Sequence, residues 1–333
     1  MVKAFVFGKF LPFHKGHEAM INFALAHCDL LTVLVCCSDK EKIPGNTRQG
    51  WIEETFRGNN KIQIKTYNYL ESELPNTSVS SKEVSKVWAT KFKEFFPDYD
   101  LVITSEEYGS YVASYMGIEH IAFDLTKQLF PVSSTAVRND LISNWNFLPA
   151  SVKPFFAIKV VLLGTESSGK TTLTQRLAKH FNCSYVEEAG RDIIENSNSF
   201  DFDDLNLVAS EHARRIEEAI LGESPLIIID TDIHITKSYA RFIFEKELEV
   251  KSSTYNSSKA DLYLYLSKDL GYIQDGTRLS ENDRNLLDLC HRNILKEHNI
   301  EIVEITGSWE ERFEKAVTLI NGLLDTHNKK RWA

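Results

Sequence analysis

The segment GTESSGKT at residues 164–171 constrains the fold of this chain more than any other. It follows an apolar run at 158–163 and matches the pattern G-x-x-x-x-G-K-[ST] in every fixed position. In such a loop a strand ends, backbone amides surround a phosphate group, and a helix begins. A plain turn is the alternative, but Lys170 would then repel the positive end of the following helix unless an anion lay between them. We therefore expect a nucleotide-binding unit.

The order of apolar runs predicts two domains of one class. The 333 residues exceed one ordinary core, and short apolar runs alternate with segments of helical period in both halves. This predicts an α/β chain with two doubly wound parallel-sheet domains. Two prolines within residues 146–154 suit a linker, so we place the domains at 1–150 and 151–333. Residues 251–259 are expected to form a surface loop. Strands are expected at residues 3–7, 30–36, 61–67, 101–104, 120–123, 157–163, 183–186, 226–229, 262–266 and 300–305.

Charge and cysteine content exclude several classes of protein. The formal net charge is -9, and because nucleic acids are bound by clustered Lys and Arg, we expect no nucleic-acid partner. The five cysteines are odd in number and form no metal-ligand cluster. No run of about eighteen apolar residues predicts a membrane span. We expect a cytoplasmic protein that is neither exported nor held in a membrane, and a homo-oligomer is compatible with the sequence.

Two histidines follow the first predicted strand. After Gly8 the sequence reads KFLPFHKGH, which places His14 and His17 three residues apart where a helix starts. Ring N–H groups and a helix start can stabilise charge on a phosphate, and Gly16 lets the backbone approach a ligand. The alternative is a pair of surface or half-buried histidines without a ligand.

A second anion site is expected further along the first half. The hydroxyls of Ser133, Ser134 and Thr135 open a predicted helix that runs to about Trp145, and Arg138 follows one turn later. Hydroxyls at a helix start and a forked guanidinium suit a phosphate. The alternative is that Ser133 or Ser134 simply caps the helix.

Together these segments resemble the paired H-x-G-H and S-S-T-x-x-R signatures of the nucleotidyltransferase superfamily. The string GKFLPFHKGH, RQGW at 48–51 and TSEEYG at 104–109 are similar to the NadR-type branch, whose acceptor is nicotinamide mononucleotide. The resemblance implies a Rossmann-like domain in which His14, His17 and Arg138 bind the phosphates of ATP. The supporting residues implied are Gly8, Lys9, Phe10, Gly16, Ser133, Ser134 and Thr135 for ATP, and Trp51, Glu107 and Tyr108 for the substrate. Trp51 or Tyr108 would stack on a ligand ring, and for Trp51 packing in the core is an equal alternative.

The second half carries acidic residues at the ends of two predicted strands. In doubly wound sheets the acceptor binds at the carboxyl ends of strands, where Glu188, Asp230 and Asp232 fall. We assign Glu188 as the general base on a sugar hydroxyl and Asp230 to Mg²⁺ with Thr171, although the three carboxylates can exchange roles. Lys170 is expected to bridge the β- and γ-phosphates. The other residues expected to bind ATP are Gly164, Glu166, Ser167, Ser168, Gly169, Thr171 and Thr172.

A loop at 269–278 is expected to close over the γ-phosphoryl group. Arg278 and Arg284 would be the cations of this lid, which would exclude water. A solvated charged loop is the alternative.

The second half also resembles a known domain, the ribosylnicotinamide kinase of the NadR family. The resemblance rests on the phosphate loop, YVEEAGRD at 185–192, DTD at 230–232 and YIQDGTR at 272–278. It implies substrate contacts from Tyr272, Asp275 and Asp232. The sequence departs from the family at two places: Gly271-Tyr272 stands where the family has Pro-Trp, and Ala189 stands where it has an aromatic residue.

The resemblance extends from about residue 3 to residue 324 and implies a bifunctional enzyme of NAD salvage. The second domain would phosphorylate nicotinamide riboside with ATP and Mg²⁺, and the first would adenylylate the mononucleotide to NAD. The family's N-terminal DNA-binding helix-turn-helix is not seen, because residue 3 already begins a predicted strand, so we expect no repressor function. The alternatives are a fused pantetheine-phosphate adenylyltransferase and dephospho-coenzyme A kinase, or a regulator that senses ATP without turnover.

Overall fold

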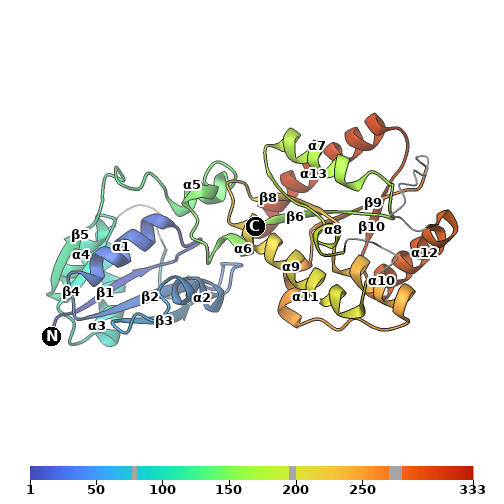
Figure 1. Cartoon of the computed structure of the whole chain (residues 1–333). Helices are drawn as coiled ribbons and strands as arrows, with labels where there is room; N and C mark the ends of the chain where they lie inside the picture. The colour runs from blue at the N-terminus through green and yellow to red at the C-terminus, as the bar shows by residue number, and fades with distance from the viewer. Residues whose placement is uncertain (77–80, 195–199, 270–279, 333) are drawn as a thin grey trace. The chain divides into compact units, whose positions relative to one another are not determined.

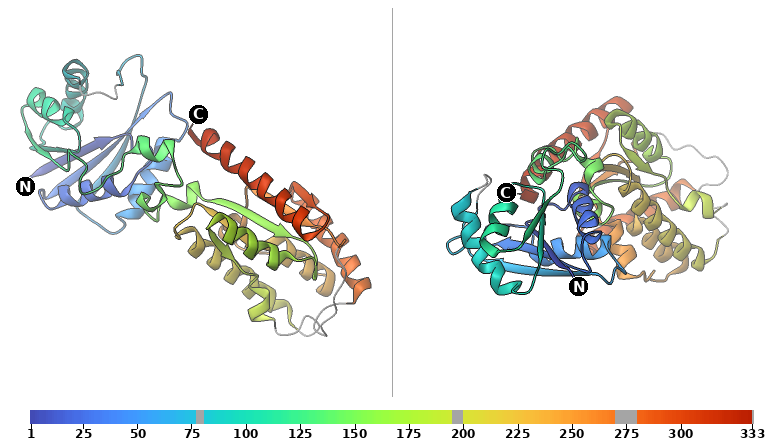
Figure 2. Two further views of the ribbon diagram at one scale, coloured as in Figure 1. Left: turned by 90° about the horizontal axis from the view of Figure 1, so that it is seen from above. Right: turned by 90° about the vertical axis from the view of Figure 1, so that its left-hand side faces the viewer.

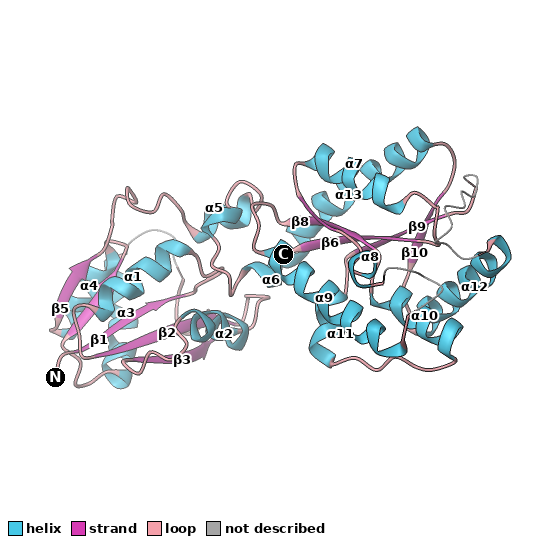
Figure 3. Cartoon of the chain, viewed as in Figure 1, coloured by secondary structure: helices cyan, strands magenta, loops and turns pink. Residues whose placement is uncertain are grey.

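The computed structural model describes residues 1–76, 81–194, 200–269 and 280–332. The chain forms two compact units, one consisting mainly of Met1–Lys153 and the other of Pro154–His327. Each unit is built on a five-stranded, all-parallel sheet with helices on both faces (Figures 1 and 3). The prediction of two doubly wound α/β domains is confirmed. Within the described ranges, no helix is both long enough and apolar enough to cross a membrane.

The first unit has the strand order β3-β2-β1-β4-β5. Since parallel crossovers are right-handed, this order places α1 and α2 on one face and α3 and α4 on the other. The second face is rich in aromatic residues, with Phe5 stacked on Phe96 at 4.4 Å between ring centroids. The elements are β1 (Lys3–Gly8), α1 (Lys15–Leu25), β2 (Leu30–Ser38), α2 (Gly45–Thr55), β3 (Ile62–Tyr69), α3 (Lys82–Phe95), β4 (Leu101–Thr104), α4 (Tyr108–Met116), β5 (Glu119–Ala122), α5 (Ser134–Asn139) and the 3-10 helix η1 (Trp145–Phe147).

The second unit has the strand order β10-β9-β6-β8-β7. Helices α7 and α13 cover one face, where Leu173 and Leu177 share a core with Ala316 and Ile320 (Figure 2). The elements are α6 (Lys153–Phe156), β6 (Ile158–Leu163), α7 (Lys170–Phe181), β7 (Ser184–Val186), α8 (Gly190–Ile193), α9 (Phe202–Ile220), β8 (Leu226–Asp230), α10 (Ile233–Phe244), α11 (Ser252–Ser258), β9 (Leu262–Leu266), α12 (Glu281–Glu297), β10 (Ile302–Ile305) and α13 (Trp309–Trp332).

Two segments differ from the sequence-based expectation. The helix expected to reach Trp145 ends at Asn139, because Asp140 and Asn144 bond to backbone groups that a longer helix would use. The expected loop at 251–259 contains helix α11. Hydrogen bonds between the Tyr255 hydroxyl and the rings of His234 and His298 hold this helix in place. Tertiary contacts override the weak helix propensity of its serines there.

Candidate active sites

The first site lies where the chain leaves β1 at Gly8 and enters α1 at Lys15. His14 is the N-cap of α1, since its Nδ1 accepts a hydrogen bond from the backbone amide of His17 at 3.4 Å. The two imidazoles stack with 3.7 Å between their centroids. A Cβ atom on Gly16 would lie 3.1 Å from the His14 ring, so glycine suits this tight turn. The expected histidine pair therefore exists as one compact unit.

Both histidines are neutral at physiological pH. Burial, reinforced by the charge of Lys127, lowers the pKa of His14 to about 3. Burial also lowers the pKa of His17 well below its usual value, with His14 and Lys127 adding to the effect. Because the Nδ1 of His14 accepts a hydrogen bond, its proton is assigned to Nε2, which can donate. The rings are thus N–H donors rather than imidazolium cations.

Helix α5 brings the second expected anion site to the same loop. The Ser134 hydroxyl donates to the carbonyl of Pro12 at 3.1 Å, and Arg138 donates through Nη1 to the carbonyl of Leu11 at 2.5 Å. Arg138 also donates to the Thr135 hydroxyl at 2.9 Å. The structure therefore brings together the two motifs, which lie more than a hundred residues apart in the sequence.

Ser133 and Phe10 have structural roles beside this site. The Ser133 hydroxyl accepts from the amide of Ala136 at 3.1 Å and caps α5, which is the alternative that the sequence left open. Phe10 is buried, and its ring packs edge-on against His17 at 5.0 Å. Both residues shape the site, and their side chains are committed to packing or capping.

Of the aromatic residues expected at the substrate, Trp51 is buried and Tyr108 is partly buried against the aromatic core. Trp51 on α2 is only 5% exposed, which agrees with the core-packing alternative. Tyr108 packs against the aromatic core with its ring 5.5 Å from Phe7, and burial raises its pKa. Glu107 precedes α4 and is exposed. The burial of Trp51 does not fit stacking on a ligand ring, whereas stacking by Tyr108 stays a prediction.

Sequence reasoning missed Lys127 at this site. Its ammonium lies 2.9 Å from the Glu106 carboxylate, and its charge contributes to the lowered pKa of His14 and of His17. It stands between β5 and α5, where no local pattern singles it out. Lys127 is a further cation available to an anionic ligand.

The second site is the loop between β6 and α7. Gly164 has φ +138° and Gly169 has φ +89°, backbone conformations that other residues rarely adopt. The ammonium of Lys170 donates to the carbonyls of Gly164 at 2.9 Å and Thr165 at 3.1 Å. Lys170 is therefore folded onto the loop that an ATP phosphate would fill. Thr172 follows on the exposed side of α7.

A carboxylate and a hydroxyl meet beside this loop. The Thr171 hydroxyl donates to Asp230 at the end of β8 at 2.5 Å, and Arg191 donates to Thr171 at 2.5 Å. Asp230 is only 1% exposed, and its Oδ1 makes no hydrogen bond within the described ranges. Burial raises the pKa of Asp230, and the nearby Glu188 adds to this effect. An unpartnered buried carboxylate oxygen beside a hydroxyl fits a divalent cation.

Glu188 lies at the edge of the same cluster. Its carboxylate is 3.4 Å from Nε of Arg191, the residue that also contacts Thr171. Sequence reasoning quoted Arg191 in a motif without giving it a role. The arginine joins Glu188 to the Thr171–Asp230 pair.

Asp232 and Arg284 are not placed as expected. Asp232 is fully buried and caps α10 by accepting from the amides of His234 and Ile235 at 3.0 and 3.3 Å, while its other oxygen pairs with the His234 ring. A substrate contact by Asp232 does not fit this role. Arg284 lies buried in the first turn of α12 and donates to the Thr165 hydroxyl at 3.1 Å, so it supports the phosphate loop and is no lid cation. Tyr272, Asp275 and Arg278 lie outside the described residues.

Helix α13 supports the phosphate loop from its other side. Arg312 is fully buried and donates to the carbonyls of Gly307 and Ser168 at 2.9 Å each. A Cβ atom on Gly169 would lie 2.3 Å from the indole of Trp309. Sequence reasoning missed both residues, because they lie about 140 positions beyond the loop and carry no motif.

In the described part of the chain, no group of three or more histidine, cysteine or acidic residues could hold a metal ion by itself. The two sheets and their phosphate sites define a two-domain nucleotide-binding protein, with a nucleotidyltransferase-type domain before a P-loop domain of kinase type. Family models agree, since residues 5–140 match a cytidylyltransferase-like family and residues 159–312 match an AAA domain family.

Relatives and solved structures extend this likeness over nearly the whole chain. The trifunctional NAD biosynthesis/regulator protein NadR of Escherichia coli (strain K12) is 28% identical over 346 residues, covering 96% of this chain and 82% of its own. A NadR protein solved in complex with NR has a TM-score of 0.66 at 20% identity, covering 96% of this chain and 95% of its own. Another, solved with NAD and AMP-PNP, has a TM-score of 0.64 at 19% identity and covers the same shares. The chain is therefore homologous to NadR proteins over nearly its whole length.

Proposed function

We propose that this protein catalyses two consecutive steps of NAD salvage. The second unit transfers the γ-phosphoryl group of ATP to nicotinamide riboside, and the first joins the resulting nicotinamide mononucleotide to the adenylyl group of a second ATP, giving NAD and pyrophosphate. The observation that supports the proposal is the clustering of the expected residues, His14 and His17 with the Arg138 loop contact in one unit and Lys170–Thr171 with Asp230 in the other. The relative named for NAD biosynthesis and the NadR structures with NR, NAD and AMP-PNP support these substrates.

In the second unit, Lys170 leaves the carbonyls of Gly164 and Thr165 and pairs with the β- and γ-phosphates. Thr171 and Asp230 would hold Mg²⁺, and the bound ion would neutralise charge on the phosphate oxygens. The ribose 5'-hydroxyl oxygen bonds to the γ-phosphorus, the bond to the β–γ bridging oxygen breaks, and ADP leaves. Glu188 takes the hydroxyl proton in our assignment, with Asp230 as the alternative base.

In the first unit, a phosphate oxygen of the mononucleotide attacks the α-phosphorus of ATP. The bond to the α–β bridging oxygen breaks and pyrophosphate leaves. No general base is needed, because the attacking phosphate is a dianion whose oxygen carries no proton. The neutral rings of His14 and His17 donate N–H groups to phosphate oxygens, and Arg138 supplies a permanent positive charge. Binding and orientation supply most of the rate enhancement. For well-placed reactants they lower the activation free energy by ~7 to 11 kcal/mol.

A substrate comparison tests this proposal. The full chain with ATP and Mg²⁺ is incubated with nicotinamide riboside, with nicotinamide mononucleotide, or with phosphopantetheine and dephospho-coenzyme A, and products are separated by chromatography. We expect mononucleotide from the riboside and NAD from the mononucleotide, with no turnover of the coenzyme A precursors. Transfer only to those precursors would favour the rival pair of activities, and ATP binding without any transfer would favour a sensor.

A further inference from the structure

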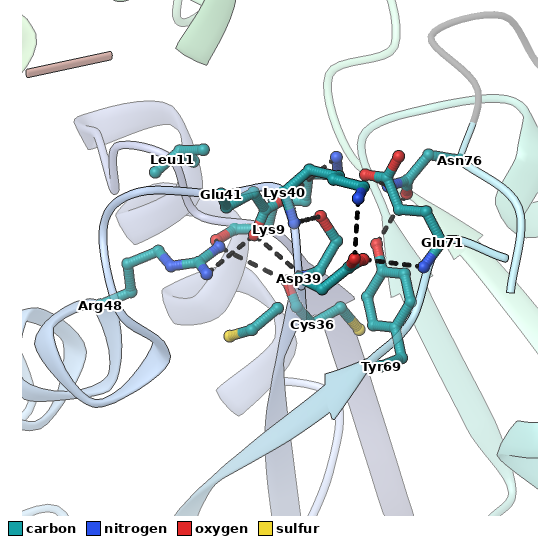
Figure 4. A network of polar contacts seen from close by, with 12 residues as sticks. Lys9, Leu11, Cys36, Asp39, Lys40, Glu41, Arg48, Tyr69, Glu71 and Asn76 are labelled. Carbon is teal, nitrogen blue, oxygen red and sulfur yellow. Dashed lines mark hydrogen bonds and ion pairs between the residues drawn. The ribbon is translucent and has the colours of Figure 1, made fainter. Parts of the chain in front are cut away.

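Lys9 is the first residue after β1, on the segment that leads to the histidine pair, and it is held at two points. Its backbone carbonyl accepts from Nη1 of Arg48 at 2.8 Å. Its ammonium lies 3.0 Å from Oε1 of Glu41. Figure 4 shows Lys9, Glu41 and Arg48 turned toward one another from three separate segments. The same small network therefore fixes both the backbone and the side chain of Lys9.

The base of this network is a buried ion pair. Oε2 of Glu41 lies 2.8 Å from Nη2 of Arg48 and accepts from the amide of Ser38 at 3.1 Å. The side chain of Glu41 is 7% exposed and that of Arg48 is 1% exposed. An unpaired charge at such a site is strongly unfavourable, so each partner keeps the other in place.

Lys9 is the outward-facing member of the network. Its side chain is 44% exposed, in contrast to the two charges beneath it. Because the Glu41 carboxylate is already paired with Arg48, the Lys9 ammonium is the accessible cation of this trio, and the charge of Glu71 also acts near it. An anion that reaches the loop meets an ammonium whose position is already restrained, which lowers the entropy lost on binding.

Glu41 also acts electrostatically on Arg138, a second cation of the site. Burial lowers the pKa of Arg138, whereas the charge of Glu41 acts in the opposite direction. The Glu41 carboxylate therefore lies within electrostatic reach of Lys9, Arg48 and Arg138, although α2 and α5 are distant in the sequence.

We propose that Glu41 and Arg48 are positioning residues for adenylyl transfer, which act by fixing Lys9 against the triphosphate of ATP. The inference rests on the proposed function of the first unit. Neither side chain is expected to contact ATP itself, because both are buried and their charged groups pair with each other.

A double-mutant cycle in the full chain tests the inference. The variants are Lys9→Ala, Glu41→Gln and their combination, and kcat/KM is measured for NAD formation from ATP and nicotinamide mononucleotide. Glutamine keeps the size of Glu41 and can still accept from Ser38. Each single change should lower kcat/KM by roughly ten- to a hundredfold, and the double variant should be no slower than Lys9→Ala. Riboside phosphorylation should stay at the wild-type rate in every variant.

Two further variants keep the test decisive. Lys40→Ala removes the same charge next to Glu41, but Lys40 pairs with Asp39 at 3.1 Å, so this matched control should be as active as the wild type. Arg48→Lys keeps a cation beside Glu41 but cannot bridge its carboxylate and the Lys9 carbonyl together. Arg48→Lys should slow NAD formation in the wild-type background and have no further effect in the Lys9→Ala background. This second cycle replaces the first if Glu41→Gln does not fold.

The inference would be overturned if the losses in kcat/KM of the single variants multiplied in the double variants, or if Lys9→Ala formed NAD at the wild-type rate. Either result would leave the proposed function intact. Absence of NAD formation by the wild-type chain would instead refute the proposed function of the first unit. Thermal unfolding of each variant separates a loss of fold from a loss of positioning.

Discussion

The Thr171 hydroxyl donates a 2.5 Å hydrogen bond to the Asp230 carboxylate, which joins the start of α7 to the end of β8. The second oxygen of Asp230 is buried and makes no hydrogen bond among the described residues. Such an oxygen is costly unless a cation or donor satisfies it in the working enzyme. The proposed function places the metal at this pair.

Asp230→Asn should lower kcat for riboside phosphorylation by about a hundredfold or more, because an amide binds a divalent cation more weakly than a carboxylate. The change is measured by ADP release at saturating ATP with a titration of Mg²⁺, whose half-saturating concentration should rise. NAD formation from the mononucleotide in the same chain is the control. A full phosphorylation rate in this variant would remove Asp230 from the metal site.

The first unit should lose stability in mild acid. The pKa of His14 is about 3 in the fold, below the value of about 6.5 for an unfolded chain, so below pH 6.5 the unfolded state takes up a proton that the folded state refuses. Stability is therefore complete above pH 6.5 and falls as the pH drops toward 3. From pH 7 to pH 5, His14 alone should cost about 2 kcal/mol.

Urea unfolding of the full chain and of His14→Asn measures this effect. Asparagine keeps an N-cap acceptor but does not titrate, so the free energy of unfolding should depend less on pH in the variant. Equal pH dependence in the two proteins would show that the His14 ring is not kept neutral by the fold.

Arg138→Lys should lower kcat/KM for NAD formation by about a hundredfold, because lysine cannot reproduce the forked contacts to Leu11 and Thr135 while meeting a phosphate. The kinase rate should not change. Retention of full NAD formation would argue that α5 only supports the loop.

Arg312→Met should weaken the second unit, because the carbonyls of Ser168 and Gly307 lose their buried donor. We expect a loss of about 3 kcal/mol in the free energy of unfolding and a higher KM for ATP. The matched control is Arg176→Met on α7, where an exposed arginine pairs with Glu310 of α13. This change should cost less than about 1 kcal/mol. Similar effects of the two changes would contradict a special role for Arg312.

The ten strands of the described ranges were predictable from the sequence. The inner strands, such as β2 and β8, are buried on both faces and read as short continuous apolar runs. The less buried strands β3 and β5 carry a weaker signal of the same kind. The phosphate loop was predictable for a different reason: its glycines and Lys170 are required at fixed positions by a local backbone shape. In both cases the signal lies within a few consecutive residues.

The roles of Asp230 and Asp232 could not be separated in this way. Thr231 between them has φ +70°, a conformation that a β-branched residue rarely adopts. That turn leaves Asp230 at the site and directs Asp232 to the cap of α10. The support from Arg284 and Arg312 was equally hidden, because it depends on helices more than a hundred residues beyond the loop.

The central claim is that each unit binds its own ATP and catalyses its own transfer. The most direct measurement follows both products in two variants of the full chain, Lys170→Ala and His17→Ala, with ATP, Mg²⁺ and either the riboside or the mononucleotide. We predict that Lys170→Ala forms NAD from the mononucleotide but does not phosphorylate the riboside, and that His17→Ala does the reverse. Loss of both reactions in either variant, or of neither, would contradict the account.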